Sequence, residues 1–230
     1  MTVGDIKERI AGRADDSALT PVTVSDVELL AAINEGQQLS GLLTLFLEKT
    51  DNLTITGCWQ RVRPTLTDFL VPLRLSIAGV RLRPATLTEL DAENTAWQNA
   101  SGTAARYFMA GFDLLAVTPE QLATARMTYA ASPTILTSDG QTPQLPAEYH
   151  QDLVNYGIYR VRLKEGAQSL QRGLGYLDRF LDDMTRLGNY VRARSAAARY
   201  DTMPFELALF DRSRLIKEVV AWQAKSTAKQ

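Results

Sequence analysis

The sequence has very few of the residues that build disulfides and metal centres. It contains one cysteine, Cys58, and one histidine, His150, among 230 residues. A single cysteine excludes an intrachain disulfide, and together with one histidine it leaves little from which to assemble a zinc site. No run of about 18 apolar residues occurs, so we expect no membrane span, and residues 1–13 lack the apolar core of a signal peptide. The formal net charge of −1 does not favour nucleic-acid binding through bulk positive charge.

Helical periodicity dominates both ends of the chain. Residues 3–13 place Val3, Ile6 and Ile10 on one side of a short amphipathic helix. Ser25 and Glu28 have the spacing of a capping box, which predicts a helix over residues 25–48. Beyond Pro146 we predict two more helices, over residues 147–165 and 168–200. The apolar positions of the last helix are close to a heptad seam: Leu170, Leu174, Leu177, Leu181, Met184 and Val191.

The middle of the chain changes to a period of two, which is typical of strands. Residues 71–77 alternate apolar and polar side chains, Ala78-Gly79 offers a turn, and residues 80–83 form the return strand. Pro72 lacks a backbone donor, so we expect it at a sheet edge or a bulge. Residues 107–109 and 114–117 predict a second hairpin around Gly111, and residues 126–130 a further strand.

Two shorter features punctuate this region. Thr86 and Glu89 form a second capping box, which predicts a short helix ending near Asn94. Thr118-Pro119-Glu120-Gln121 could open a helical turn, but only a handful of residues remain before the next strand. The predicted fold is therefore mainly α: an antiparallel long-helix bundle with an inserted small β-subdomain over about residues 53–130. Residues 1–202 would form one domain and residues 203–230 a C-terminal arm.

Acidic residues of the last helix are the strongest candidates for catalysis. Asp178 and Asp182 share one helical face, and Asp183 is adjacent, a spacing that could hold a divalent metal. Helical hydrolases of this kind also need a second acidic helix facing the first. The other close pair, Glu148 and Asp152, lies at a helix start, where the macrodipole already explains acidic residues. We interpret the acidic residues of the last helix as a solvated face, and keep the hydrolase as the alternative.

Other candidate sites are weaker. His150 has no accompanying nucleophile, so we expect either a surface position at the helix start or a packing role. Arg172-Gly173-Leu174-Gly175 lacks the Lys-Ser/Thr ending of a phosphate loop, and its glycines are expected to permit close helix packing. Two groups of basic residues could contact phosphate, but we interpret both as structural. Arg160, Arg162 and Lys164 are spread around their helix, and Arg192, Arg194 and Arg199 lie at a helix end, where cations offset the dipole.

One arrangement of motifs resembles a known family. Leu145-Pro146, Tyr149-His150, Leu153-Val154, Tyr156 and Arg160 follow one another at the start of the 147–165 helix, and Leu87–Leu90, Trp97, Arg106–Phe108 and Phe112–Leu114 precede them. This order is similar to that of the head–tail adaptor (connector) proteins of tailed bacteriophages. The similarity spans about residues 25–200. Gly157 departs from the pattern, which usually has alanine there.

The resemblance implies a non-enzymatic virion protein without a cofactor. Such a protein would form a dodecameric ring at the neck, join the portal to tail or nozzle proteins, and let genomic DNA pass without sequence-specific binding. It would reach the virion from the host cytoplasm. Another neck or tail-completion ring protein is the alternative within this class. The C-terminal arm is the expected portal-binding segment, because its apolar residues exceed those of a solvated tail: Phe205, Leu209, Phe210, Ile216, Val219 and Trp222.

Overall fold

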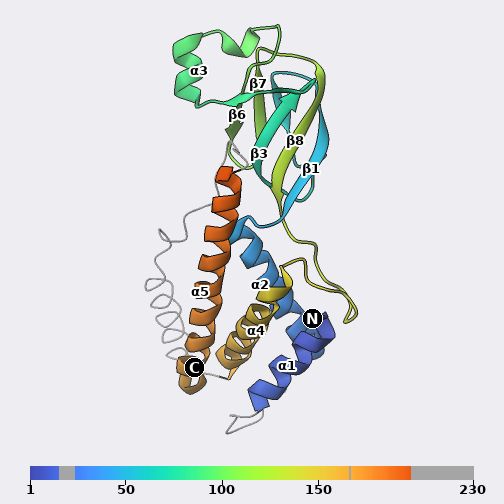
Figure 1. Cartoon of the computed structure of the whole chain (residues 1–230), viewed down its shortest axis with the longest axis vertical. Helices are drawn as coiled ribbons and strands as arrows, with labels where there is room; N and C mark the ends of the chain where they lie inside the picture. The colour runs from blue at the N-terminus through green and yellow to red at the C-terminus, as the bar shows by residue number, and fades with distance from the viewer. Residues whose placement is uncertain (16–23, 166, 198–230) are drawn as a thin grey trace, which may run out of the picture. The chain divides into compact units, whose positions relative to one another are not determined.

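The computed structural model describes residues 1–15, 24–165 and 167–197. The described chain divides into two compact units (Figure 1). The helical unit comprises Met1–Phe46 and Pro133–Val191, and the β unit comprises Leu47–Ser132 with the last residues of the final helix. The predicted C-terminal arm, residues 203–230, lies outside the described residues.

The prediction of a mainly α fold is wrong. The described residues form five helices and eight strands in two sheets, with 47% of these residues helical and 24% in strands, which is a mixed α/β fold. The strand content was underestimated because β1 (Glu48–Ile55) and β2 (Trp59–Arg61) carry little apolar alternation. Their conformation comes from pairing with distant strands, and such tertiary pairing overrides local preference.

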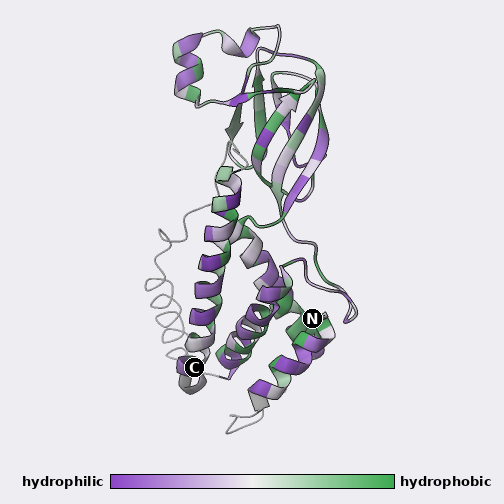
Figure 2. Cartoon of the chain, viewed as in Figure 1, coloured by the Kyte–Doolittle hydropathy of each residue, from purple (hydrophilic) through white to green (hydrophobic). Residues whose placement is uncertain are grey.

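Four helices build the helical unit: α1 (Val3–Asp15), α2 (Asp26–Thr44), α4 (His150–Lys164) and α5 (Ala167–Ala197). A 3₁₀ turn, η2 (Ala147–Tyr149), leads into α4. Hydrophilic and hydrophobic residues alternate along α5 with helical spacing (Figure 2). The expected seam is confirmed, since its residues are buried or partly buried. All but Leu170 join one core with α1, α2 and α4. The fully buried members of this core include Val3, Ile6, Ile10, Ile33, Leu153, Val154, Ile158, Phe180 and Met184.

Glycine allows α4 to approach two neighbouring helices closely. A Cβ at Gly157 would lie 2.3 Å from Cδ1 of Ile10 in α1, and a Cβ at Gly36 would lie 2.9 Å from Cδ1 of Tyr156. Gly157 is the position at which the family pattern usually has alanine. In this chain the isoleucine of α1 occupies that space, so the two residues fit as a pair.

The start of α2 agrees with prediction, whereas its end does not. The Ser25 hydroxyl accepts from the Glu28 backbone, and the Glu28 carboxylate accepts from the Ser25 backbone, so the capping box is confirmed. The helix ends at Thr44, before the expected residue 48, because Leu45 turns into the left-handed region with a φ of 53°.

The segment before α4 is held by two amide side chains of α2. Asn34 donates to the Leu136 carbonyl and accepts from the Leu136 backbone, at 2.9 and 2.7 Å. Gln37, which is fully buried, donates to the Thr134 carbonyl and accepts from the Gln144 backbone, at 3.0 and 2.7 Å. These pairs satisfy backbone groups that have no secondary structure of their own.

The β unit contains two four-stranded sheets. The first has the order β1-β8-β3-β4, with β3 (Phe69–Ile77), β4 (Val80–Arg81) and β8 (Ala123–Ala131). The second has the order β2-β7-β6-β5, with β5 (Arg83–Pro84), β6 (Arg106–Ala110) and β7 (Leu114–Thr118). One apolar core includes residues of both sheets, among them Leu53, Leu75, Met127, Tyr107, Leu115 and Val117.

Both predicted hairpins are confirmed. Ala78 and Gly79 turn the first one with φ values of 49° and 80°, and β6 pairs with β7 around Gly111. Pro72 lies at an irregularity in the register between β3 and β8, as its missing donor requires. The second capping box opens α3 (Leu87–Glu93) before a 3₁₀ turn, η1 (Trp97–Asn99). The predicted helical turn at residues 118–121 is wrong, because β7 continues to Thr118 and β8 begins at Ala123.

Candidate functional site

The acidic residues of α5 do not form a metal centre. Within residues 1–15, 24–165 and 167–197, no group of three or more metal-binding side chains converges. Asp182 is exposed, Asp178 and Asp183 are half-buried, and Asp183 accepts from Arg186 at 2.8 Å. Asp182 fits the interpretation of a solvated helix face, whereas Asp183 is half-buried and bound to Arg186.

A carboxyl pair between α4 and α5 was missed from the sequence. Asp152 is only 4% exposed and shares a hydrogen bond with Asp183 across the two helices. Burial, followed by the bond to Asp183, raises the pKa of Asp152 from 3.8 to about 8. Because a protonated carboxyl can donate to its neighbour, the pair joins the two helices below that pKa. In the sequence analysis, the helix macrodipole at the start of α4 was enough to explain an acidic residue at position 152, so this contact was not expected.

His150 and Cys58 are both buried in the structure. The His150 ring is 1% exposed, its Nε2 donates to the Leu145 carbonyl at 2.7 Å, and its Nδ1 lies 3.0 Å from the Met1 nitrogen. This confirms a packing role, although not at the surface. Cys58 is buried, and burial raises the pKa of its thiol, which disfavours the nucleophilic thiolate.

The Arg172–Gly175 segment lies inside α5 and is no phosphate loop. A Cβ at Gly173 would lie 2.9 Å from Cβ of Arg162, so this glycine does permit close packing of α4 and α5. Gly175 has no neighbouring atom within 4 Å, so the expected packing role is wrong for that residue.

Four of the six basic residues that sequence analysis offered as phosphate contacts form ion pairs. Arg160 pairs with Glu35 at 3.2 Å, and Lys164 pairs with Glu28 at 2.7 Å. Arg162 is 2% exposed and pairs with Glu165 at 2.7 Å, and Arg194 pairs with Glu48 at the same distance. These groups stabilise the fold locally and do not form a shared basic surface. Arg199 lies outside the described residues.

The motif that carries the family resemblance is mainly a packing motif. Leu145, Leu153 and Val154 are in the core of the helical unit. Tyr156 packs against Phe180 with ring centroids 5.0 Å apart. Upstream, Trp97 is 2% exposed and donates from Nε1 to Asp91 at 2.8 Å, and its ring lies 5.6 Å from that of Trp59. The motif residues therefore indicate the fold of the family, and they do not mark a surface that binds a partner.

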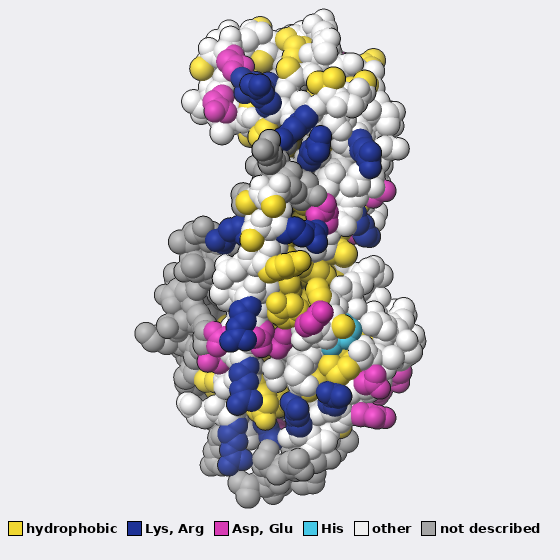
Figure 3. Space-filling view, in the orientation of Figure 1, with side chains coloured by type: hydrophobic (Ala, Val, Ile, Leu, Met, Phe, Trp, Pro, Cys, Tyr) yellow, Lys and Arg dark blue, Asp and Glu magenta, His cyan; other side chains and the backbone are white. Residues whose placement is uncertain are grey.

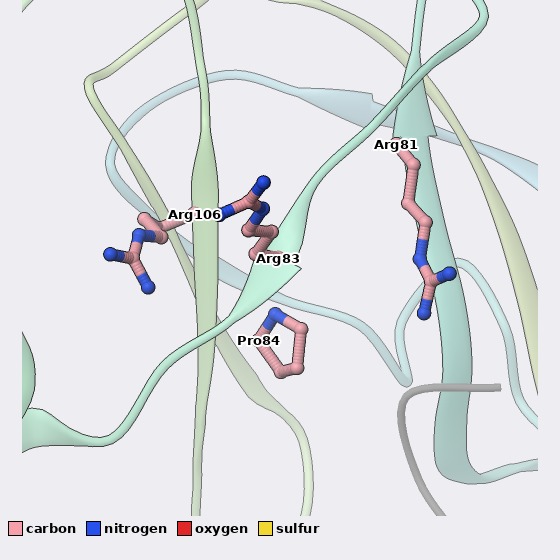
Figure 4. A pocket seen from close by; sticks show the side chains of 4 residues that line it. All are labelled: Arg81, Arg83, Pro84 and Arg106. Atoms are coloured by element: carbon pink, nitrogen blue, oxygen red, sulfur yellow. The ribbon is translucent and has the colours of Figure 1, made fainter. Parts of the chain in front are cut away.

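An arginine-lined pocket opens in the β unit where β4, β5 and β6 meet. Arg81, Arg83, Pro84 and Arg106 line a hollow of about 600 Å³ (Figure 4). Arg83 and Arg106 are opposite each other in the parallel β5–β6 pair. Arg106 forms an ion pair with Glu93, whereas no carboxylate of the described residues pairs with Arg83. A positive pocket of this kind fits an anionic group.

A second basic surface lies on the first sheet, beside this pocket. Its outward positions are occupied by arginine, hydroxyl and amide side chains, which border a hollow of about 430 Å³. Arg74 and Arg126 are exposed on the adjacent strands β3 and β8. Lys and Arg side chains recur on the visible face of this unit in Figure 3. We call this surface the arginine face; it consists of Thr50, Asn52, Thr54, Arg74, Ser76, Arg81, Thr124, Arg126 and Thr128.

The expected portal-binding residues cannot be located on either unit. Phe205, Leu209, Phe210, Ile216, Val219 and Trp222 all lie outside the described residues.

None of the described helices is apolar over a stretch long enough to cross a membrane.

Comparison with known families agrees with the resemblance found in the sequence. The family model described as SU10 adaptor protein matches residues 1–203, and the chain therefore belongs to that family. No curated protein matches the chain. The resemblance to phage head–tail adaptors is confirmed, and the chain is a phage adaptor protein, a class of structural virion components.

Proposed function

We propose that this adaptor protein assembles into a ring that joins the portal to the tail and continues the DNA channel at the neck of the virion. The family match over residues 1–203 carries the proposal. The described fold supports it, because the motif residues of α4 build a rigid helical core and not a catalytic site. The ring is expected to be dodecameric and to serve no enzymatic reaction.

We further propose that the C-terminal arm, residues 203–230, binds the portal. Its support is the sequence: an apolar segment of this length gains free energy by burying area, at about 25 cal/mol per Å². Ordering the segment costs about 1–2 kcal/mol per residue in backbone entropy, so a partner surface is needed to favour order. Deleting residues 203–230 should therefore leave both units folded and abolish stable attachment to portal-containing heads.

Native mass spectrometry of the full chain with and without purified portal tests both parts. We expect a ring-sized complex with portal for the full chain, and none for the deletion variant. Asp178→Asn/Asp182→Asn is the matched control, since it should assemble normally. A full chain that stays a small oligomer with portal present would refute the ring. Metal-dependent nucleotide hydrolysis lost in the control variant would instead favour the hydrolase.

A further inference from the structure

The arginine face is a continuous polar surface built by strand register. Asn52 of β1, Arg126 of β8, Ser76 of β3 and Arg81 of β4 are successive partners across the four strands. Thr50, Thr128 and Arg74 form the neighbouring row, and the Thr50 and Thr128 hydroxyls lie 3.0 Å apart. Arg74 and Arg126 are diagonal neighbours, so their Cα atoms are about 7–8 Å apart. The surface therefore presents two arginine side chains from neighbouring positions, with short hydroxyl side chains around them.

Seven of the eight carboxylates within residues 47–132 are engaged elsewhere in the β unit, and the eighth, Glu120, lies near Cys58. Asp51 and Asp68 both accept from the Tyr129 hydroxyl, and Asp68 also pairs with Lys49. Asp113 pairs with Arg61. The remaining engaged carboxylates belong to Glu48, which pairs with Arg194, and to Glu89, Asp91 and Glu93 around α3.

Arg74 and Arg126 consequently have no ion pair with any residue that the structure describes. Glu48 shares the side of β1 that bears Thr50 and Asn52, but it lies at the end of the strand and is bound to Arg194. Two exposed guanidinium groups without a local counter-charge attract an external anion, and their fork of donors suits phosphate.

We propose that the arginine face binds the phosphate backbone of nucleic acid without reading its sequence. This deepens the proposed function, on which it rests, because DNA is the polyanion that such a ring would surround. Arginine with threonine, serine and asparagine is the set of side chains that contacts phosphate and sugar oxygens. The face of a four-stranded sheet is broader than the helix or two-stranded ribbon that the major groove admits, so base reading is not expected.

The composition of the surface favours nucleic acid over an acidic protein segment. Protein interfaces bury an apolar or aromatic centre inside a polar rim. All nine side chains of the arginine face are polar or charged, and the apolar residues of β1, β3 and β8 point to the opposite side, into the core. Interfaces with nucleic acid are more polar and more positive, as this surface is.

The test measures binding of the full-length chain to a short mixed-sequence DNA duplex at several salt concentrations. Arg74→Ala/Arg126→Ala should weaken binding and lower the salt dependence. If the slope falls by about 0.9 for each lost phosphate contact, the unmodified chain should lose about twelvefold more affinity than the variant between 50 and 200 mM salt. Arg63→Ala is the matched control, since Arg63 is exposed in the same unit but lies outside this face. It should bind and melt as the unmodified chain does.

Four results would overturn the proposal. The first is that the double variant and the unmodified chain bind DNA equally, and the second is that the unmodified chain does not bind DNA at 50 mM salt. The third is a strong preference of the unmodified chain for one duplex sequence. The fourth is displacement of the DNA by poly-glutamate at equal charge. The last would assign the face to an acidic protein segment. Measuring assembly of the same variants with portal separates the two proposals. A chain that binds DNA but forms no complex with portal would refute the ring and not the DNA-binding role of the arginine face. A chain that forms the complex but does not bind DNA would refute only the role of the arginine face.

Discussion

The contact between α1 and α4 gives the sharpest stability prediction. Gly157→Ala adds a methyl group 2.3 Å from Cδ1 and 2.9 Å from Cγ1 of Ile10, which is fully buried. Alanine is favoured over glycine inside a helix by about 1 kcal/mol. Overpacking a buried site costs about 1–3 kcal/mol. The two terms oppose each other, so we expect a net destabilisation of about 0–2 kcal/mol.

Gly175→Ala isolates the packing term because it makes the same substitution in α5 with no atom within 4 Å. It should stabilise the chain by about 1 kcal/mol. The difference between the two variants in the free energy of unfolding should then equal the packing cost of about 1–3 kcal/mol. Urea unfolding followed by circular dichroism measures both.

Ile10→Val completes the cycle, since it removes Cδ1, the nearer atom. By itself this change typically costs about 0.5–1.5 kcal/mol. In the Gly157→Ala background it should cost less or become stabilising, because it relieves the contact. Additive effects of the two substitutions, or a Gly157→Ala variant as stable as Gly175→Ala, would refute the close approach of α1 and α4.

Two further substitutions test the interior of the helical unit. Leu177→Asp places an unpaired charge at a position that is 3% exposed, so it should destabilise the chain by more than about 3 kcal/mol in the same urea assay; a normally melting variant would contradict a buried seam. Asp152 has a pKa raised by burial and by Asp183, so the stability that its carboxyl contributes is present below about pH 4 and is lost as pH rises toward 8. Asp152→Asn should flatten the fall in unfolding free energy over that range, and an unchanged pH slope would show that the carboxyl is not buried.

Local signals predicted the elements that have local causes. The capping boxes at Ser25 and Thr86 and the turn at Ala78–Gly79 depend on residues within four positions of one another, and all three are confirmed. The strands β1 and β2 could not be predicted in the same way. Glu48–Ile55 has two buried apolar residues, Leu53 and Ile55, and its partner β8 begins about 70 residues later.

In the candidate sites too, local features were predicted from the sequence and tertiary contacts were not. Sequence reasoning placed Asp178 and Asp182 correctly on one helix face, and it assigned His150 a packing role. It missed the Asp152–Asp183 pair because that contact depends on how α4 packs against α5. It also treated Gly157 as a departure from the family pattern, whereas the structure explains the residue by the position of Ile10.

The net charge of the chain does not show how its charges are distributed in the fold. A formal charge of −1 did not favour binding of nucleic acid through bulk positive charge. The fold separates the charges: carboxylates of the β unit bind Tyr129, Lys49, Arg61 and helix caps, while register places Arg74 beside Arg126. A nearly neutral chain can therefore carry a local positive face. Two arginines in each subunit would give weak, salt-sensitive contacts repeated around a ring, which are compatible with DNA that slides.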